Sequence, residues 1–149
     1  MHPRWKSTAA GALATVVWGA LEPLDMRLLR HDYSDVAVLG KAFTRGRMWR
    51  PLGFAIHAAN GAMFGLAFHE ARRRVAVDER RLALGMALVE HLTLFPLGAL
   101  ADRFHPARGE PGVAKLFHPR AFVQATARHA LFGVLLGRLG AQHSAARPR

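Results

Sequence analysis

The sequence predicts an all-α integral membrane protein, built as a four-helix bundle in a single domain of 149 residues. Residues 51–69 contain no charged side chain, and as a helix with a rise of about 1.5 Å per residue they would extend about 28 Å. That length is close to the roughly 30 Å hydrocarbon core of a bilayer. Apolar segments of similar length recur along the chain between arginine-rich connections. We therefore expect membrane spans at residues 7–26, 51–69, 82–101 and 120–139.

The composition is strongly basic, with 21 lysine and arginine residues against 10 aspartate and glutamate residues. Such a balance is typical of proteins with a nucleic acid or an anionic surface as partner. The basic residues lie mainly between the apolar segments, which favours contacts with anionic lipid headgroups over nucleic acid. A soluble, basic, helical protein that binds nucleic acid is the alternative. The absence of cysteine excludes disulfides, thiolate metal sites and cysteine nucleophiles.

The first segment, residues 7–26, is preceded by basic residues and has the length of a signal peptide core. The small residues of a cleavage site do not follow it, so we expect a retained span. Glu22 and Asp25 are three residues apart and share one helix face near its end. Two interpretations are open: the carboxylates mark the exit from the membrane, or they belong to a polar interior.

Residues 27–50 form a long connection that predicts a short helix at the membrane interface. Ser34 is suited to cap it, and Val36, Leu39 and Phe43 follow at helical spacing.

The second segment carries a ridge of small residues on one helix face. A ridge of glycines allows another helix to approach closely, as in the Gly-xxx-Gly contacts of membrane helices. Asn60 lies one turn from the histidine of this ridge, so we expect both polar side chains to face a neighbouring helix. The ridge recurs every fourth residue and comprises Gly53, His57, Gly61 and Gly65.

The third segment is apolar except near its centre, where Glu90 and His91 lie one turn before Pro96. The turn at 70–81 that precedes it contains five arginines and is the densest positive stretch of the chain. The connection at 102–119 holds two related Phe-His-Pro pieces.

The fourth segment reproduces part of the second one. It carries His129, Gly133 and Gly137 at the spacing of His57, Gly61 and Gly65, together with Gln124 and Arg128. This correspondence predicts two tandem repeats, each a helical hairpin.

Converting residue offsets into depth places the polar side chains in one half of the bilayer, on the side of the connections 27–50 and 102–119. Because an isolated charge in a membrane is costly, we expect Glu90 and Arg128 to form an ion pair between helices. The pattern also predicts a vestibule open to that side. The predicted intramembrane cluster comprises His57, Asn60, Glu90, His91, Gln124, Arg128 and His129, with Glu22 and Asp25 nearer the surface.

Three histidines from different spans, His57, His91 and His129, have the chemistry of a metal or haem site. No pair of ligands lies three or four residues apart within one helix, as di-iron bundles require. We therefore expect no metal and no cofactor. No phosphate-binding loop, catalytic triad or paired-carboxylate motif is present, so we do not expect an enzyme.

The motifs of the spans resemble those of small, uncharacterised four-helix membrane proteins of bacteria. The resemblance implies an inner-membrane location and transfers no activity. It rests on Gly53, His57, Asn60, Gly61, Phe64 and Gly65 in the second segment, Glu90 and His91 in the third, and Arg128, His129, Phe132, Gly133 and Gly137 in the fourth.

The density of arginine at 70–81 favours a cytoplasmic turn, with both termini cytoplasmic in a multi-pass topology. Our first functional hypothesis is a binding or transport module for a small molecule or ion, with the polar cluster as its site. The glycine ridge would then pack within the monomer or form a homo-oligomer. The second hypothesis is a membrane scaffold or assembly protein in which the cluster only fixes helix register.

Overall fold

The computed structural model describes residues 2–144, and its elements are helical, which confirms the all-α prediction. Within this range the extended pairing is limited to an isolated bridge between Tyr33 and Val113. In chain order the elements are α1 (Pro3–Leu29), α2 (Asp35–Lys41), α3 (Trp49–Arg74), α4 (Glu79–Leu94), the 3-10 helix η1 (Phe95–Leu97), α5 (Gly98–Phe104) and α6 (Pro119–Ser144).

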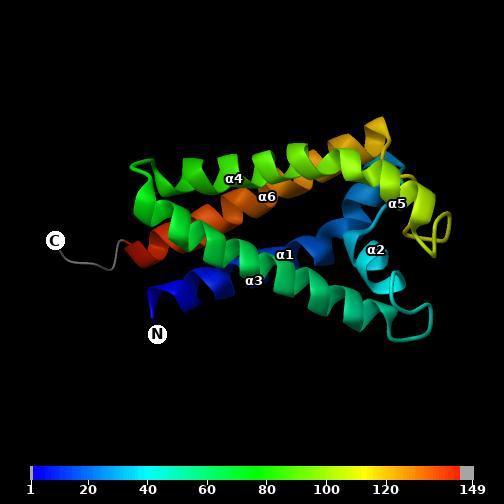
Figure 1. The fold of residues 1–149 in the computed structure, drawn as a ribbon, viewed down its shortest axis with the longest axis horizontal. Helices are drawn as coiled ribbons and strands as arrows, with labels where there is room; N and C mark the ends of the chain where they lie inside the picture. Colours follow the sequence, from blue (N-terminus) through cyan, green and yellow to red (C-terminus); the bar gives the residue numbers. More distant parts are fainter. Residues whose placement is uncertain (1, 145–149) are drawn as a thin grey trace.

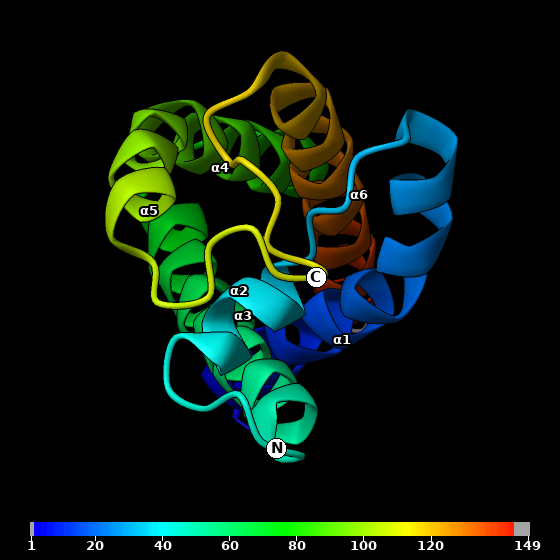
Figure 2. The same ribbon diagram turned by 90° about the vertical axis from the view of Figure 1, so that its right-hand side faces the viewer.

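The long helices alternate in direction along the long axis of the molecule (Figure 1). The start of α1, the turn between α3 and α4 and the end of α6 lie at one end. The short helices α2 and α5 and the connections beside them lie at the other end, nearest the viewer in Figure 2. This up-and-down course is the one expected for four consecutive spans.

Two of these helical segments are long and apolar enough to cross a membrane, counting the described residues alone: Trp49–Arg74 and Glu79–Phe104. Four were expected from the sequence. α1 and α6 have the length of a span, but buried ionisable side chains such as Glu22 and Arg128 lower their hydropathy.

Pro96 interrupts the segment predicted as the third span. Proline has no backbone N–H to donate and its ring disturbs the preceding helical turn. The chain accordingly tightens into η1 over Phe95–Leu97 and continues as α5. The helical segment predicted over 82–101 therefore extends from Glu79 to Phe104 in the structure and consists of three consecutive elements, α4, η1 and α5.

The α2 helix begins as predicted. The Ser34 hydroxyl accepts a hydrogen bond from the backbone N–H of Ala37 at 3.0 Å, which confirms Ser34 as the N-cap. α2 packs closely on α3, because a Cβ atom added to Gly40 would lie 1.9 Å from the Trp49 carbonyl oxygen. Phe43, which was expected to continue this helix, lies beyond its end and is exposed.

The glycines of α3 meet two different neighbours. A Cβ atom added to Gly65 would lie 2.2 Å from the Ser7 carbonyl oxygen of α1, and one added to Gly61 would lie 1.8 Å from the Thr15 hydroxyl. Gly53 faces α2 instead, 2.1 Å from the Val36 carbonyl oxygen by the same measure. The ridge is therefore used inside the monomer, against α1 and α2.

The corresponding glycines of α6 face α4. A Cβ atom on Gly133 would lie 2.7 Å from Cα of Leu84, and one on Gly137 would lie 2.9 Å from Cα of Arg80. The helices thus associate as α1 with α3 and α4 with α6, and α1 also packs against α6. Although α3 and α4 are consecutive, they share few contacts. Duplicated hairpins would produce this pairing, and the duplication itself stays a prediction.

The two Phe-His-Pro pieces use their histidines in the same way. The ring nitrogen Nδ1 of His105 accepts from the N–H of Ala107 at 3.1 Å, and Nδ1 of His118 accepts from the N–H of Arg120 at 3.2 Å. His105 also donates from Nε2 to the Val38 carbonyl oxygen at 2.9 Å, which ties the connection before α6 to α2.

We expect Gly11→Ala to lower the free energy of unfolding by about 1–3 kcal/mol, the usual cost of overpacking. The new Cβ atom would lie 2.0 Å from the Gly61 carbonyl oxygen, so α1 and α3 would have to separate. Thermal unfolding followed by circular dichroism measures the change. Gly85→Ala in α4 is the control: no atom lies within 4 Å of its Cβ position, and the variant should gain about 0.5–1 kcal/mol. Equal behaviour of the two variants would contradict the close α1–α3 contact.

Candidate functional site

The Arg128 side chain of α6 is buried at the junction of three helices, with 3% of its surface exposed. Its Nε and Nη2 atoms bind both carboxylate oxygens of Asp25 in α1, at 2.5 and 2.7 Å. Nη1 donates to Asp35 at the start of α2, at 2.8 Å, and lies 3.7 Å from Glu22 of α1. We call these four residues the Arg128 cluster. A two-pronged arginine–carboxylate contact fixes orientation as well as distance, so the cluster aligns α1, α2 and α6.

The predicted ion pair between Glu90 and Arg128 is wrong. Glu90 lies near His129 instead, with 3.9 Å between Glu90 Oε2 and His129 Nε2. Consecutive residues of an α-helix point about 100° apart. Arg128 therefore faces α1 and α2, whereas the neighbouring His129 faces α4.

Glu22 has a further role inside the Arg128 cluster. Its carboxylate accepts from the Ser34 hydroxyl at 2.5 Å and from the backbone N–H of Asp35 at 2.9 Å. A carboxylate at the first turn of a helix satisfies free N–H groups and favours the helix dipole. Glu22 thus holds the start of α2 from a different helix, and the structure places it and Asp25 inside the bundle.

Gln124 extends the cluster by one turn of α6. Its side-chain amide donates to Asp25 at 2.7 Å and to the Tyr33 carbonyl oxygen at 3.3 Å. The same carbonyl oxygen accepts from Arg128 at 2.8 Å. The segment before α2 is therefore bound to α6 through its backbone.

Two side chains near the start of α2, those of Tyr33 and Asp35, have shifted pKa values. Burial by itself raises the pKa of the Asp35 carboxyl, but the Arg128 guanidinium, His57 and the hydrogen bond from Tyr33 together outweigh burial, and the pKa of Asp35 lies below its usual value. Burial, reinforced by the charge of Asp35, raises the pKa of the Tyr33 hydroxyl well above its usual value. Tyr33 therefore stays protonated and donates a hydrogen bond to Asp35.

A cavity of about 280 Å³ lies beside the Arg128 cluster. Its aromatic walls come from Trp18, Tyr33, Phe64, Phe95 and Phe132. The predicted polar residues divide between the two places. Glu22, Asp25, Gln124 and Arg128 belong to the cluster or bind it, and the cavity is lined by His57, Asn60, Glu90, His91 and His129.

Hydrogen bonds fix the protonation of two of the cavity histidines. The Thr126 hydroxyl donates to the Phe122 carbonyl oxygen, so it accepts from Nε2 of His91 at 2.9 Å. Nδ1 of His129 lies 2.8 Å from the Ala125 carbonyl oxygen and must carry a hydrogen. For neutral His129 this leaves Nε2, the atom that faces Glu90, as a hydrogen-bond acceptor.

The three histidines proposed as alternative metal ligands do not converge. The rings of His91 and His129 lie 5.0 Å apart, whereas His57 makes its ring contact with Trp18, whose centroid lies 5.8 Å from that of His57 and 5.3 Å from that of His129. Among the described residues no group of three potential ligands is arranged to hold a metal ion.

Two polar atoms of the cavity walls are buried without a hydrogen-bond partner in the described part of the chain: Nε1 of Trp18 and Nε2 of His57. An unsatisfied buried polar group costs about 1–3 kcal/mol. The four residues of the Arg128 cluster are thus paired within the protein, and the cavity walls retain unused hydrogen-bonding capacity. Oε1 of Gln124, beside the cluster, is also buried without a partner in the described chain.

The cavity opens on the side of the bundle. Its most exposed lining residues are Asn60 of α3 and Leu94 of α4, and the Glu90 side chain beside them is 39% exposed. Val38 and Leu39 of α2 line the cavity towards the end of the bundle and are less exposed. The most exposed lining residues therefore indicate a mouth between α3 and α4, where those helices separate, and the vestibule predicted at the α2 end stays a prediction.

No family model matches the chain. No curated protein and no solved structure matches it either. The geometry of the cavity and of the Arg128 cluster therefore carries the functional interpretation.

The residues of the site that were not predicted from the sequence include Trp18, Tyr33 and Asp35. A signal for Trp18 exists, because it precedes Glu22 by four residues and Asp25 by seven and so shares their helix face. Tyr33 and Asp35 flank the Ser34 cap, and nothing in their local pattern indicates an arginine ninety residues further along the chain as partner.

We expect Arg128→Met to lower the free energy of unfolding by about 3–5 kcal/mol, since it leaves buried carboxylates without a counter-charge. Chemical denaturation of the purified protein measures the loss. Arg138→Met is the matched control, an exposed arginine of the same helix, and should change stability by less than about 0.5 kcal/mol. Adding Asp25→Asn and Asp35→Asn to Arg128→Met should recover part of the loss. A cluster that contributes nothing would give equal stabilities for Arg128→Met and Arg138→Met.

Proposed function

We propose that this protein crosses a membrane four times, through α1, α3, α4 with α5, and α6, and that its central cavity binds a small molecule. The observation that carries the proposal is the distribution of polarity. Large apolar side chains cover the outside of the bundle, while small, polar and charged side chains fill much of its inside. A water-soluble helical protein has the opposite distribution.

The α1 helix illustrates this inversion. Leu13, Val16 and Leu24 are 41–57% exposed, whereas Thr15 and Glu22 are buried. Similar apolar surfaces cover the other long helices. They include Met63 and Leu66 on α3, Val89, Leu92, Leu97 and Leu100 on α4 to α5, and Val123 and Val134 on α6. Apolar surface of this extent is favourable in lipid and unfavourable in water.

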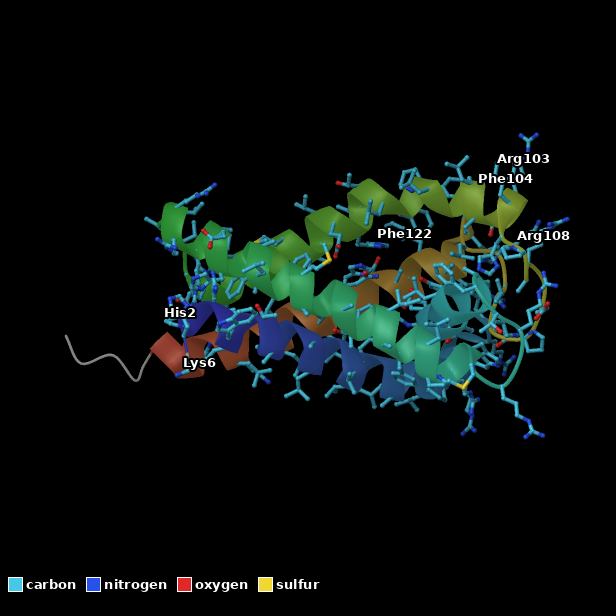
Figure 3. The ribbon with its side chains drawn as sticks, turned by 60° about the horizontal axis from the view of Figure 1, so that its bottom comes forward. His2, Lys6, Arg103, Phe104, Arg108 and Phe122 are labelled. Carbon is cyan, nitrogen blue, oxygen red and sulfur yellow. The ribbon has the colours of Figure 1, made fainter. Side chains whose placement is uncertain are left out.

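Charged residues frame an apolar belt. Residues 51–69 contain none, and Glu90 is the one acidic or basic residue of 82–101. Basic residues lie at the two ends of the bundle, such as Lys6 at one end and Arg103 and Arg108 at the other (Figure 3). This arrangement suits contact with the headgroups of two leaflets.

α1 and α6 are less hydrophobic than α3 and α4. Their ionisable groups are nevertheless consistent with membrane spans, because these groups lie inside the bundle. Arg128, Glu22 and Asp25 pair with one another in the interior, away from the outer surface. Ionised side chains in membrane proteins are tolerated where they face the bundle interior and are paired. The outer faces of α1 and α6 then present apolar side chains to lipid.

The binding part of the proposal depends on the cavity. Binding sites for small molecules are concave and mostly apolar, with a few converging polar groups. The cavity combines five aromatic walls with two carboxylates, histidines and an asparagine. Its unsatisfied hydrogen-bonding groups favour binding over a purely structural role.

A scaffold or assembly role is the second candidate, and the Arg128 cluster favours it. The cluster ties three helices together, and this structural role is sufficient to explain its buried charged residues. In this alternative the cavity has no ligand, and the basic ends contact lipids or other proteins.

For the topology we propose an inner-membrane location with the turn between α3 and α4 in the cytoplasm. Three consecutive arginines, Arg72 to Arg74, end α3, and Arg80 and Arg81 begin α4. Short cytoplasmic turns carry such clusters. The mouth of the cavity then lies within the bilayer, and α2 and the connection that follows α5 lie on the opposite side.

The absence of cysteine allows this topology to be tested with single introduced thiols. In intact cells, a membrane-impermeant maleimide should label Arg108→Cys. It should label Val77→Cys, in the α3–α4 turn, after the cells are opened. Met63→Cys, at an exposed site of α3 within the belt, should stay unlabelled in both conditions until detergent is added.

Alkaline carbonate extraction provides the control for membrane insertion, and the protein should remain in the membrane pellet. Release into the supernatant, together with labelling of Met63→Cys without detergent, would contradict the proposal. Those results would favour the soluble nucleic-acid-binding alternative.

A further inference from the structure

We propose that the central cavity binds a small organic cation, an amine with an apolar body, which enters from the bilayer between α3 and α4 and takes Glu90 as its counter-ion. This inference rests on the proposed function and names the class of ligand for the same cavity.

The charges around the cavity favour a cation. Asp35 and Glu90 line it, and no lysine or arginine of the described chain does. Arg128 lies behind Asp35 and is shared among Asp35, Asp25 and Glu22. With Asp25 and Asp35 ionised, the Arg128 cluster carries at least one more negative than positive charge, whether or not Glu22 is protonated. In a low-dielectric interior such an excess attracts a cation and disfavours an anion.

Glu90 and His129 present a gap that an ammonium group would fill. Glu90 Oε2 and His129 Nε2 lie 3.9 Å apart, too far for a hydrogen bond. Both are acceptors when His129 is neutral, since its hydrogen is on Nδ1. Across residues 2–144, no hydrogen bond reaches the Glu90 carboxylate. An ammonium group placed between the two acceptors would donate to each and would neutralise Glu90.

The aromatic walls would hold the apolar body of the ligand. The rings of Phe64 and Phe132 meet edge to face, with 5.1 Å between their centroids, and Phe95 also lines the cavity. Aromatic faces attract cations as well as apolar groups. Neighbouring polar groups, Asn60 and Nε2 of His57, remain for a second substituent of the ligand.

The size of the cavity limits the ligand. Pockets for drug-sized molecules have roughly 300–1,000 Å³, and about 280 Å³ lies below that range. A single ring with a short aminoalkyl chain is therefore the expected scale.

The mouth indicates the route of entry. Asn60, Glu90 and Leu94 lie where α3 and α4 separate, in the apolar belt of the bundle. In the proposed topology this opening faces acyl chains. Alkylamines and arylalkylamines partition into lipid, so a molecule of this kind would reach Glu90 directly from the bilayer.

Three probes of similar shape and different charge test the inference: 2-phenylethylamine, 2-phenylethanol and phenylacetate. The chain has three tryptophans, so Trp5→Phe with Trp49→Phe leaves Trp18, in the cavity wall, as the fluorescent reporter. The protein is purified in detergent and titrated with each probe at neutral pH. We expect the amine to change Trp18 emission saturably, with an affinity at least tenfold higher than that of the alcohol or the anion.

Glu90→Gln should weaken binding of the amine at least tenfold and leave binding of the alcohol unchanged. Glu70→Gln is the matched control, because it removes an acidic residue that pairs with Arg73 outside the cavity. It should leave binding of all three probes unchanged. If Glu90→Gln does not fold, the comparison of the three probes on the protein with Glu90 intact decides the question.

The outcomes separate the inference from the proposed function. Equal binding of the alcohol and the amine, tighter binding of phenylacetate, or an amine affinity unaffected by Glu90→Gln would overturn the cation assignment and leave a binding cavity in place. If none of the probes binds, both the cation assignment and the binding function fail, and the scaffold role is favoured.

Discussion

The buried Arg128 guanidinium determines how the helices of this protein are arranged. A charge withdrawn from water is stable only if opposite charges and hydrogen bonds replace the water. Asp25 must therefore come from α1 and Asp35 from α2, and both must reach the same side of α6. Once they do, Glu22 lies at the start of α2 and supplies the hydrogen bonds that this helix end requires. A single buried cation thus sets the relative positions of three helices.

Glycine contacts control the remaining geometry, and the cavity follows from their uneven distribution. α1 and α3 approach until the backbone at Gly11 meets that at Gly61, and α4 and α6 approach in a similar way at Gly133. No comparable contact draws α3 and α4 together. The bundle therefore consists of two tight helix pairs joined along α1 and α6, and it is open between the other two helices. Aromatic side chains occupy part of the space between α3 and α4, and the cavity is the part that remains.

The Arg128 cluster and the polar residues of the cavity differ in how completely their charges and hydrogen-bonding groups are paired within the protein. The carboxylates around Arg128 have charged partners at short range, so structural stability accounts for them. Around the cavity, Glu90 has an imidazole 3.9 Å away, and the polar nitrogens of Trp18 and His57 have no partner in the described chain. Unused hydrogen-bonding capacity beside aromatic walls is the property of a site that a ligand completes. This difference separates the residues that hold the bundle from those that would bind a ligand.

Features that depend on local periodicity could be predicted from the sequence: the all-α class, the alternating long helices, the Ser34 cap and the spacing of the glycines. Nine polar residues could also be identified, but their division between the Arg128 cluster and the cavity became visible only in the packed bundle. The rotation of each helix about its axis determines which residues meet. That rotation cannot be inferred from the depth of a residue in the bundle or from the spacing of residues along one helix. Arg128 and His129 are adjacent in the chain and yet have different neighbours, which is why Glu90 was paired with the wrong one. Asp35 joins the cluster from outside the long helices, where no periodic pattern could indicate it.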